Sequence, residues 1–182
     1  FLNIGWAMHH IGKKDISLWD DQDSFYYDAI QFENGKSQRL RIRSLVGIIP
    51  LLAVEIMHKD VFEKLRQFNT RLQVIRLTRP DLTRIISDIE KKNKDGNYLF
   101  AIMIGDRLEH LLRRLLDEAE FLSDYGIRSL SRCHKDNPYV FGYQGRDYSI
   151  QYEPGESSSS MFGGNSNWRG PIWLPLNYLI IT

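Results

Sequence analysis

The strongest constraint on the fold is the helical periodicity of residues 105–122, GDRLEHLLRRLLDEAEFL. Apolar residues fall on one side of such a helix and charged residues on the other, as in a helix that packs against a core. Asp106 is the predicted N-cap of this helix. The apolar side consists of Leu108, Leu111, Leu112, Leu115 and Leu116.

Further helices are predicted along the chain. Residues 60–79 form an amphipathic pattern that ends before Pro80, and a second helix is expected after this proline. The stretch 44–58, SLVGIIPLLAVEIMH, is too apolar for a surface strand, so we expect a buried helix with Pro50 near its first turn. The apolar stripe of residues 60–79 is Val61, Leu65, Phe68, Leu72 and Ile75.

Two β-hairpins are predicted between these helices. Aromatic and branched residues flank Asn34-Gly35 in one segment and Gln144-Gly145 in the other, and tight turns need residues that accept positive φ angles. Helices therefore dominate, and their pairing favours an α-hairpin architecture. The fold class expected from the pattern is mainly α with two inserted β-hairpins.

Composition limits the partners. The 182 residues are 42% hydrophobic, which is enough for one globular domain. Since 24 basic residues balance 23 acidic ones, no strong field would attract nucleic acid or an anionic membrane, and neutral partners fit better. The single cysteine, Cys133, excludes an internal disulfide and makes the cytoplasm the default location.

The tryptophan-rich stretch FGGNSNWRGPIW, residues 162–173, has the composition of a sugar site. Trp168 and Trp173 offer apolar ring faces, Arg169 a planar fork of donors, and Asn167 both a donor and an acceptor. A sugar ring needs this mixture because it has an apolar C–H face and a rim of hydroxyls. Pro171 suits the first turn of a following helix. The alternative is that both indoles are core anchors beside an apolar helix.

Four blocks follow one another from about position 18 to the C-terminus: LWDDQDSFYYD, RSLVGIIPLLAVE, FLSDYGIRSLSR and YEPGESSSSMFGGNSNWRGPIWLPLNYLII. In this order they resemble the central part of the catalytic domain of glycoside hydrolase family 63, which includes processing α-glucosidase I and mannosylglycerate hydrolase. The resemblance implies an (α/α)6 toroid of six helical hairpins around a pocket. Because twelve helices need well over 300 residues, roughly, residues 1–182 are expected to be an incomplete segment of one such domain.

The resemblance also implies hydrolysis of α-glycosidic bonds in glucosides or mannosides with inversion. One carboxylic acid then protonates the leaving oxygen and a second carboxylate activates water. Both are expected outside this chain, the acid before residue 1 and the base after Thr182, so the segment alone should be inactive. An oligosaccharide or small glycoside would be the substrate, and the remainder of the catalytic domain the partner of this segment.

The site predicted within the chain is a set of substrate contacts. Glu156 is expected to orient a sugar hydroxyl or to pair with Arg169. Tyr125 and Arg128, in DYGIRSLSR, are expected to line the same pocket mouth, and the alternative there is a helix C-terminal turn with Gly126 in the left-handed conformation. The predicted contacts are Trp168, Arg169, Trp173, Asn167, Glu156, Tyr125 and Arg128.

No cofactor or metal is expected. A calcium loop starting at Asp21 would need Glu at its twelfth position, where Phe32 stands, so the acidic cluster WDDQDS is interpreted as a turn or helix cap. The five histidines lack metal-ligand spacing. Residues 79–107 match no block of the family. Two other functions stay open, a carbohydrate-binding segment without chemistry and a helical interaction scaffold.

Overall fold

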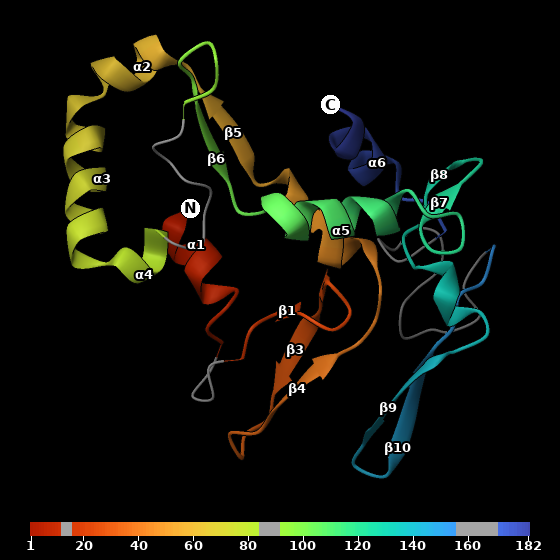
Figure 1. Ribbon diagram of the computed structural model, residues 1–182. Coiled ribbons are helices and arrows are strands. Elements are labelled where there is room, and N and C mark those ends of the chain that lie inside the picture. The colour runs from red at the N-terminus through yellow and green to blue at the C-terminus, as the bar shows by residue number, and fades with distance from the viewer. Residues whose placement is uncertain (12–15, 84–91, 156–170) are drawn as a thin grey trace.

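The computed structural model of the chain describes residues 1–11, 16–83, 92–155 and 171–182, in which helices alternate with short strands (Figure 1). The helices are α1 (Leu2–Ala7), η1 (Leu45–Leu52, 3-10), α2 (Lys59–Lys64), α3 (Arg66–Thr78), α4 (Pro80–Thr83), α5 (Gly105–Leu115), η2 (Arg132–His134, 3-10) and α6 (Leu174–Ile181). The strands are β1 (Trp19–Asp20), β2 (Phe25–Tyr26), β3 (Asp28–Gln31), β4 (Ser37–Leu40), β5 (Val54–Met57), β6 (Tyr98–Ala101), β7 (Leu122–Ser123), β8 (Gly126–Ile127), β9 (Tyr139–Tyr143) and β10 (Arg146–Ile150).

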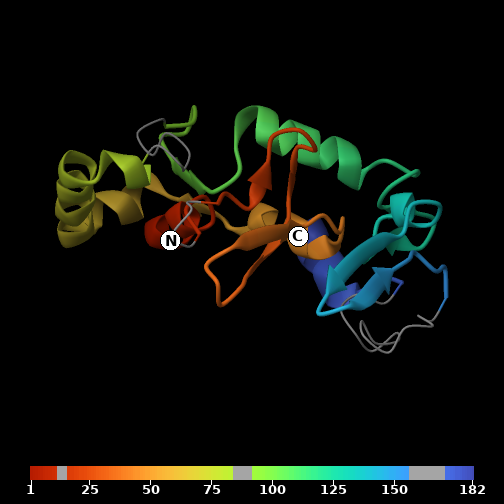
Figure 2. The ribbon, with the colours of Figure 1, turned by 90° about the horizontal axis from the view of Figure 1, so that it is seen from below.

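The fold of the described residues is mixed α/β, and the predicted mainly α, partial (α/α)6 toroid with two inserted β-hairpins is wrong for them. The strands form five separate antiparallel ribbons of two strands each: β1–β2, β3–β4, β5–β6, β7–β8 and β9–β10. Figure 2 shows these elements spread along an elongated molecule, with α2 and α3 (yellow) at one end and β9–β10 (blue) at the other.

The stretch 44–58 accounts for much of this difference. It forms the 3-10 helix η1, which contains Pro50, and then the strand β5 instead of one buried helix. Proline lacks an N–H group and cannot continue an α-helical ladder, while the β-branched Val54 and Ile56 favour extended backbone. Strand β5 pairs with β6 in the register Val54↔Ala101 to Met57↔Tyr98, so a ribbon separates the predicted helices.

The two long amphipathic helices are present, with corrections at their ends. Helix α5 begins at Gly105 with Ile104 as N-cap, and the predicted N-cap Asp106 lies inside the first turn. There its negative charge still favours the helix N-terminus. The predicted helix 60–79 is interrupted at Leu65, and of its apolar stripe only Leu72 is buried.

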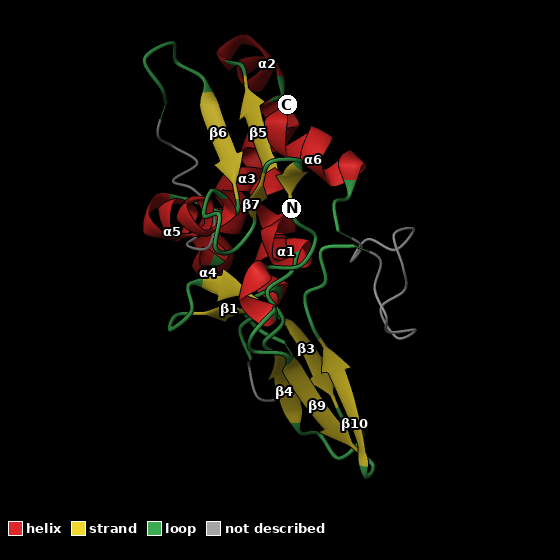
Figure 3. Cartoon of the chain, turned by 90° about the vertical axis from the view of Figure 1, so that its right-hand side faces the viewer, coloured by secondary structure: helices red, strands yellow, loops and turns green. Residues whose placement is uncertain are grey.

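Both predicted hairpins are confirmed. Gly35 has a φ of +76° in the turn of β3–β4, and Gln144 and Gly145 have φ angles of +50° and +74° in the turn of β9–β10. These two hairpins lie side by side at one end of the molecule (Figure 3). Stacked aromatic rings join them, since Phe32 lies 6.5 Å from Phe141 and 5.6 Å from Tyr143 between ring centroids.

The main core lies where β1–β2, η1, α5 and α6 meet. Gly47 of η1 packs directly against β2, and a Cβ atom there would stand 2.3 Å from the backbone oxygen of Tyr26. The described residues contain no helix long and apolar enough to cross a membrane. The buried members of the core are Trp19, Phe25, Tyr26, Tyr27, Leu45, Ile48, Met103, Leu111, Leu115, Phe121, Ile127 and Leu176.

Candidate functional site

The tryptophan-rich stretch is described only from Pro171 onward. Helix α6 begins at Leu174, so the predicted place of Pro171 in its first turn is wrong, and Pro175 stands there instead. Four of the predicted substrate contacts lie outside the described residues and stay predictions: Glu156, Asn167, Trp168 and Arg169.

The structure brings the end of this stretch next to the segment that contains the other predicted contacts. Arg128 and Ile172 form an antiparallel bridge, and the N–H of Ser129 donates to the carbonyl of Pro171 at 3.1 Å. The backbones of the two predicted parts of the site are therefore neighbours. Contact of their side chains with a sugar stays a prediction.

Arg128 is occupied by the protein itself. Its Nη1 donates to the carbonyls of Glu118 at 3.0 Å and Glu120 at 3.3 Å, and also to the carbonyl of Leu122. Its Nε donates to the Tyr152 hydroxyl at 3.2 Å. These bonds hold the loop after α5 in place, so Arg128 can help to position the site without touching a ligand.

Tyr125 and Asp124 form the turn of the β7–β8 ribbon, and Gly126 is the first residue of β8. Tyr125 is 86% exposed, and Gly126 has a φ of +124°. The alternative interpretation, a helix C-terminal turn at Gly126, is wrong because α5 already ends at Leu115. Tyr125 is therefore free of packing constraints that would prevent contact with a ligand.

Trp173 is half-buried and packs against the main core. Its carbonyl accepts hydrogen bonds from the backbone N–H and the side-chain amide of Asn177, both at 3.1 Å. This packing agrees with the core-anchor interpretation for Trp173. Trp168 lies outside the described residues, and contact of either indole with a sugar stays a prediction.

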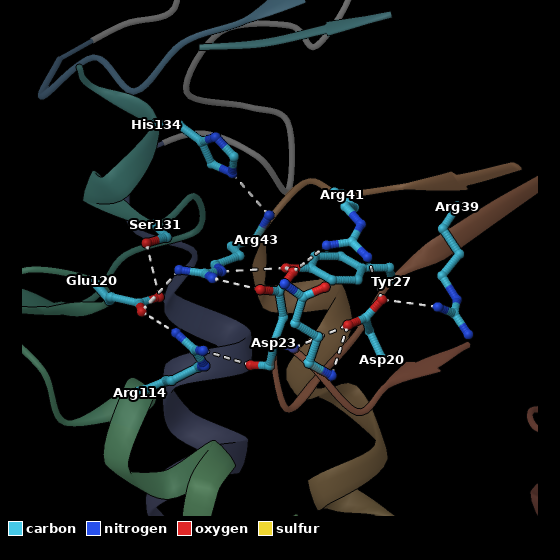
Figure 4. A network of polar contacts seen from close by, with 11 residues as sticks. Asp20, Asp23, Tyr27, Arg39, Arg41, Arg43, Arg114, Glu120, Ser131 and His134 are labelled. Carbon is cyan, nitrogen blue, oxygen red and sulfur yellow. Dashed lines mark hydrogen bonds and ion pairs between the residues drawn. The ribbon is translucent and has the colours of Figure 1, made fainter. Parts of the chain in front are cut away.

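A connected network of charged and polar side chains includes Glu120 and Ser131, on either side of the segment that contains Arg128 (Figure 4). One half of this network is centred on Asp20. The Asp20 carboxylate is 2% exposed. Its Oδ1 accepts from the N–H groups of Gln22 at 3.1 Å and Asp23 at 3.0 Å, and its Oδ2 accepts from Arg39 and Arg41, both at 2.8 Å. The acidic cluster therefore forms the predicted turn, and the predicted helix cap is wrong because the strand β2 follows it.

The charge of Asp20 is stabilised in the folded state. Burial alone would raise the pKa of this carboxyl, but the backbone hydrogen bond from Asp23 and the positive charges of Arg41 and Arg39 lower it below its usual value. Asp20 is thus a fixed anion that orients two arginines.

The other half of the network surrounds Arg43. Its guanidinium donates to Asp23 at 3.3 Å, to the Tyr27 hydroxyl at 3.3 Å and to Glu120 at 3.1 Å. Glu120 also accepts from Arg114 and, at 3.3 Å, from the Ser131 hydroxyl. This half joins β2, the end of β4 and the loop after α5 into one rigid body.

Tyr27 and His134 carry no charge in this network. Burial raises the pKa of Tyr27 to about 12, and the hydrogen bond to Asp23 acts in the same direction. The contact with Arg43 lowers this pKa but does not offset the effect of burial. Burial lowers the pKa of His134, whose Nε2 accepts from the N–H of Arg43 at 2.9 Å, so its proton resides on Nδ1. Because Tyr27 keeps its proton and the His134 lone pair is occupied, we assign both a structural role.

His9 Nδ1 and Ser17 Oγ lie 3.0 Å apart, which is the distance expected between a catalytic base and a serine nucleophile. Arg107, which can only donate, contacts His9 Nε2 at 3.3 Å, so the imidazole proton sits on Nδ1 and points to Ser17. His9 therefore cannot take the proton of Ser17. The pair is a structural contact between α1 and the start of β1.

Within residues 1–11, 16–83, 92–155 and 171–182, no group of three or more His, Cys, Asp or Glu side chains could hold a metal ion. The arginine network was not predicted from the sequence. Its signal was present, since Arg39 and Arg41 alternate along the predicted strand SQRLRI, and Arg43 continues this spacing directly after it.

Comparison with known proteins gives two relatives. The chain is 46% identical over 166 residues to an uncharacterized protein of Saccharomyces cerevisiae, covering 91% of the chain and 15% of that protein. It is 38% identical over 90 residues to a probable mannosyl-oligosaccharide glucosidase of Schizosaccharomyces pombe, covering 46% of the chain and 8% of that protein. No family model matches the chain. The chain thus spans a small part of the length of both relatives and has a partial glucosidase-like similarity.

Proposed function

We propose that this chain is a segment of a glycoside hydrolase that cleaves α-glycosidic bonds in glucosides or mannosides with inversion. The observation that carries the proposal is the 38% identity to a probable mannosyl-oligosaccharide glucosidase, a protein whose name assigns it an oligosaccharide substrate. The four sequence blocks that resemble glycoside hydrolase family 63 support the same assignment.

In this proposal the chain supplies substrate contacts, and the rest of the parent protein supplies the acid and the base. Trp168 stacks on a sugar ring, while Arg169, Asn167 and Glu156 hydrogen-bond its hydroxyls. The backbone pairing of residues 128–129 with residues 171–172 supports a shared site, because it joins the segment that follows Tyr125 to the end of the tryptophan-rich stretch. A cytoplasmic location belongs to the proposal and is checked by microscopy of the tagged protein.

The first test is the activity of the full-length protein on α-linked gluco- and manno-oligosaccharides. Inversion predicts that the sugar released first is the β-anomer, which proton NMR detects before mutarotation. Release of the α-anomer would contradict the proposed mechanism. Binding of sugar without hydrolysis would instead support the non-catalytic carbohydrate-binding function.

The second test is Trp168→Ala in the same protein. Loss of a stacking platform should reduce kcat/KM by about 10-fold or more, the effect of roughly 1.4 kcal/mol of transition-state binding. Trp6→Ala is the matched control, since Trp6 stacks on His10 in α1, outside the predicted site. Equal activity of the folded Trp168 variant and the wild type would remove this indole from the site.

A further inference from the structure

A hollow of about 800 Å³ lies between the β3–β4 and β9–β10 hairpins, away from the tryptophan-rich stretch in sequence. The segment before β1 contributes Ser17 to its wall, and β9 contributes Tyr139. Gln38, Arg39 and Arg41 come from β4 and the residue that follows it. None of its described lining residues is a predicted substrate contact of the proposed hydrolase site.

The two arginines are held in fixed positions. Both donate to the same oxygen of the buried Asp20 at 2.8 Å, and Arg39 Nε also donates to the Ser17 carbonyl at 2.8 Å. Their side chains are nevertheless 30% and 45% exposed. A guanidinium has five N–H donors, so each of these groups keeps donors for a ligand.

Among the described residues, the ion-pair network that fixes these arginines has a surplus of positive charge. Its four guanidinium groups belong to Arg39, Arg41, Arg43 and Arg114, and its three carboxylates to Asp20, Asp23 and Glu120. Arg43 and Arg114 are the less exposed of the four. The surplus charge is therefore most accessible at Arg39 and Arg41, in the hollow.

The remaining polar groups of the hollow add donors. Ser17 Oγ accepts from His9 Nδ1 at 3.0 Å and from the Trp19 N–H at 3.1 Å, so its own hydroxyl proton is available to donate. Gln38 is exposed and carries an amide NH2 group. Beside the apolar Ile16 and Val140, the hollow thus presents hydrogen-bond donors and positive charge, which favour a ligand that accepts hydrogen bonds.

We propose that this hollow binds an oxyanion, a phosphate or carboxylate group of a small ligand, between Arg39 and Arg41. Arginine forks bind such groups with two parallel, charge-assisted hydrogen bonds. Ser17 and Gln38 donate to the remaining oxygens, and Tyr139 lines the side of the hollow from which the rest of the ligand extends. The proposal is independent of the hydrolase activity.

The test is calorimetric titration of the full-length protein with inorganic phosphate, glucuronate and glucose. Glucose has the ring of glucuronate without its charge, so an oxyanion site binds glucuronate or phosphate and not glucose. Binding of phosphate alone, or of glucuronate alone, identifies which oxyanion the hollow accepts. Binding should weaken as sodium chloride is raised. Failure of both anions to bind the folded protein, or displacement of the bound anion by glucose, overturns the proposal.

Two variants locate the site. Arg41→Gln should weaken anion binding by about 10-fold, the loss of a charged hydrogen bond. Arg113→Gln on α5 is its control, because Arg113 is an exposed partner of Glu109. Gln38→Glu should abolish binding by placing a negative charge in the hollow without touching Asp20, and exposed Gln67→Glu in α3 is its control. Unchanged anion affinity in folded Gln38→Glu overturns the proposal even if Arg41→Gln fails to fold.

Discussion

Asn177 of α6 makes a two-way hydrogen bond with the backbone of Ile127 in β8. Its Oδ1 accepts from the Ile127 N–H at 2.6 Å, and its Nδ2 donates to the Ile127 carbonyl at 3.0 Å. The side-chain amide thus replaces the neighbouring strand that β8 would otherwise need on this edge. Because Asn177 is 7% exposed, water cannot take over these bonds. The contact fixes the helix after the tryptophan-rich stretch against the turn that carries Tyr125.

Asn177→Ala should destabilise the protein by about 2 to 4 kcal/mol, because it leaves the buried N–H and carbonyl of Ile127 without partners. The local effect is measurable in the full-length protein as faster hydrogen–deuterium exchange of the peptide that contains Ile127. Asn3→Ala, at an exposed position of α1, is the control. Unchanged exchange at Ile127 would show that the amide contact does not hold β8.

Gly47→Ala should destabilise the protein by at least about 2 kcal/mol. A Cβ atom at this position would stand 2.3 Å from the Tyr26 carbonyl and 2.3 Å from the Phe25 ring, and the backbone atom cannot move without shifting β2. Calorimetric melting of the full-length protein measures the loss. Gly155→Ala is the control, since a Cβ there meets nothing within 4 Å. A wild-type melting temperature for Gly47→Ala would mean that η1 and β2 are not packed as described.

His9 should make the stability of the protein depend on pH. Burial, with the positive charges of Arg107 and His10, lowers the pKa of His9 to about 4 from 6.5. As pH falls, the unfolded chain takes up this proton near pH 6.5 and the folded protein only near pH 4. The contribution of uncharged His9 to the free energy of unfolding is therefore complete above pH 6.5 and is lost as the pH falls from 6.5 to 4.

His9→Gln removes this titration, so its melting temperature relative to wild type should rise as pH is lowered from 7 to 4.5. Gln67→Ala, at an exposed position of α3 whose side chain does not titrate, should show a constant difference over the same range. The lowered pKa of His134 acts in the same direction in all three proteins and cancels in the comparison. A constant difference for His9→Gln would contradict the lowered pKa.

Turns and helices that depend on neighbouring residues could be predicted from the sequence, whereas strands that depend on distant partners could not. The turns at Asn34-Gly35 and Gln144-Gly145 and the helix at residues 105–115 depend on neighbours in sequence, and they are present. The strand β5 depends on β6, more than 40 residues away, and periodicity alone cannot distinguish a short apolar strand from a buried helix. The predicted toroid failed for this reason.

In the candidate site, too, the composition of one stretch could be recognised from the sequence, but the contacts between distant residues could not. The tryptophan-rich stretch was visible from composition. Its neighbour at residues 128–129 was indicated only by the family resemblance, because the backbone bonds that hold it leave no residue pattern. The ion pairs of Asp20 join residues about 20 positions apart, and a charge count gives a balance near zero without showing which charges meet. Only the alternation of Arg39, Arg41 and Arg43 hinted at this network.

The 182-residue polypeptide produced by itself should self-associate and hydrolyse no glycoside. One face of the β5–β6 ribbon carries Val54, Ile56 and Leu99, which are 51%, 57% and 40% exposed. Helix α6 carries further exposed apolar side chains, at Leu174, Tyr178 and Ile181. Apolar surface of this kind promotes association, because each contact removes it from water. Light scattering after size-exclusion chromatography should give masses above the 21.4 kDa of one chain, rising with concentration.

The ribbon face can be tested separately. Ile56→Lys combined with Leu99→Glu places opposite charges on directly paired positions, so the ribbon should form while its outer face becomes polar. The scattering mass should then fall toward the monomer. Glu55→Lys, on the other face of β5, should leave the association unchanged. If the unaltered polypeptide is a monodisperse monomer that melts cooperatively, these exposed apolar residues do not need a covering partner.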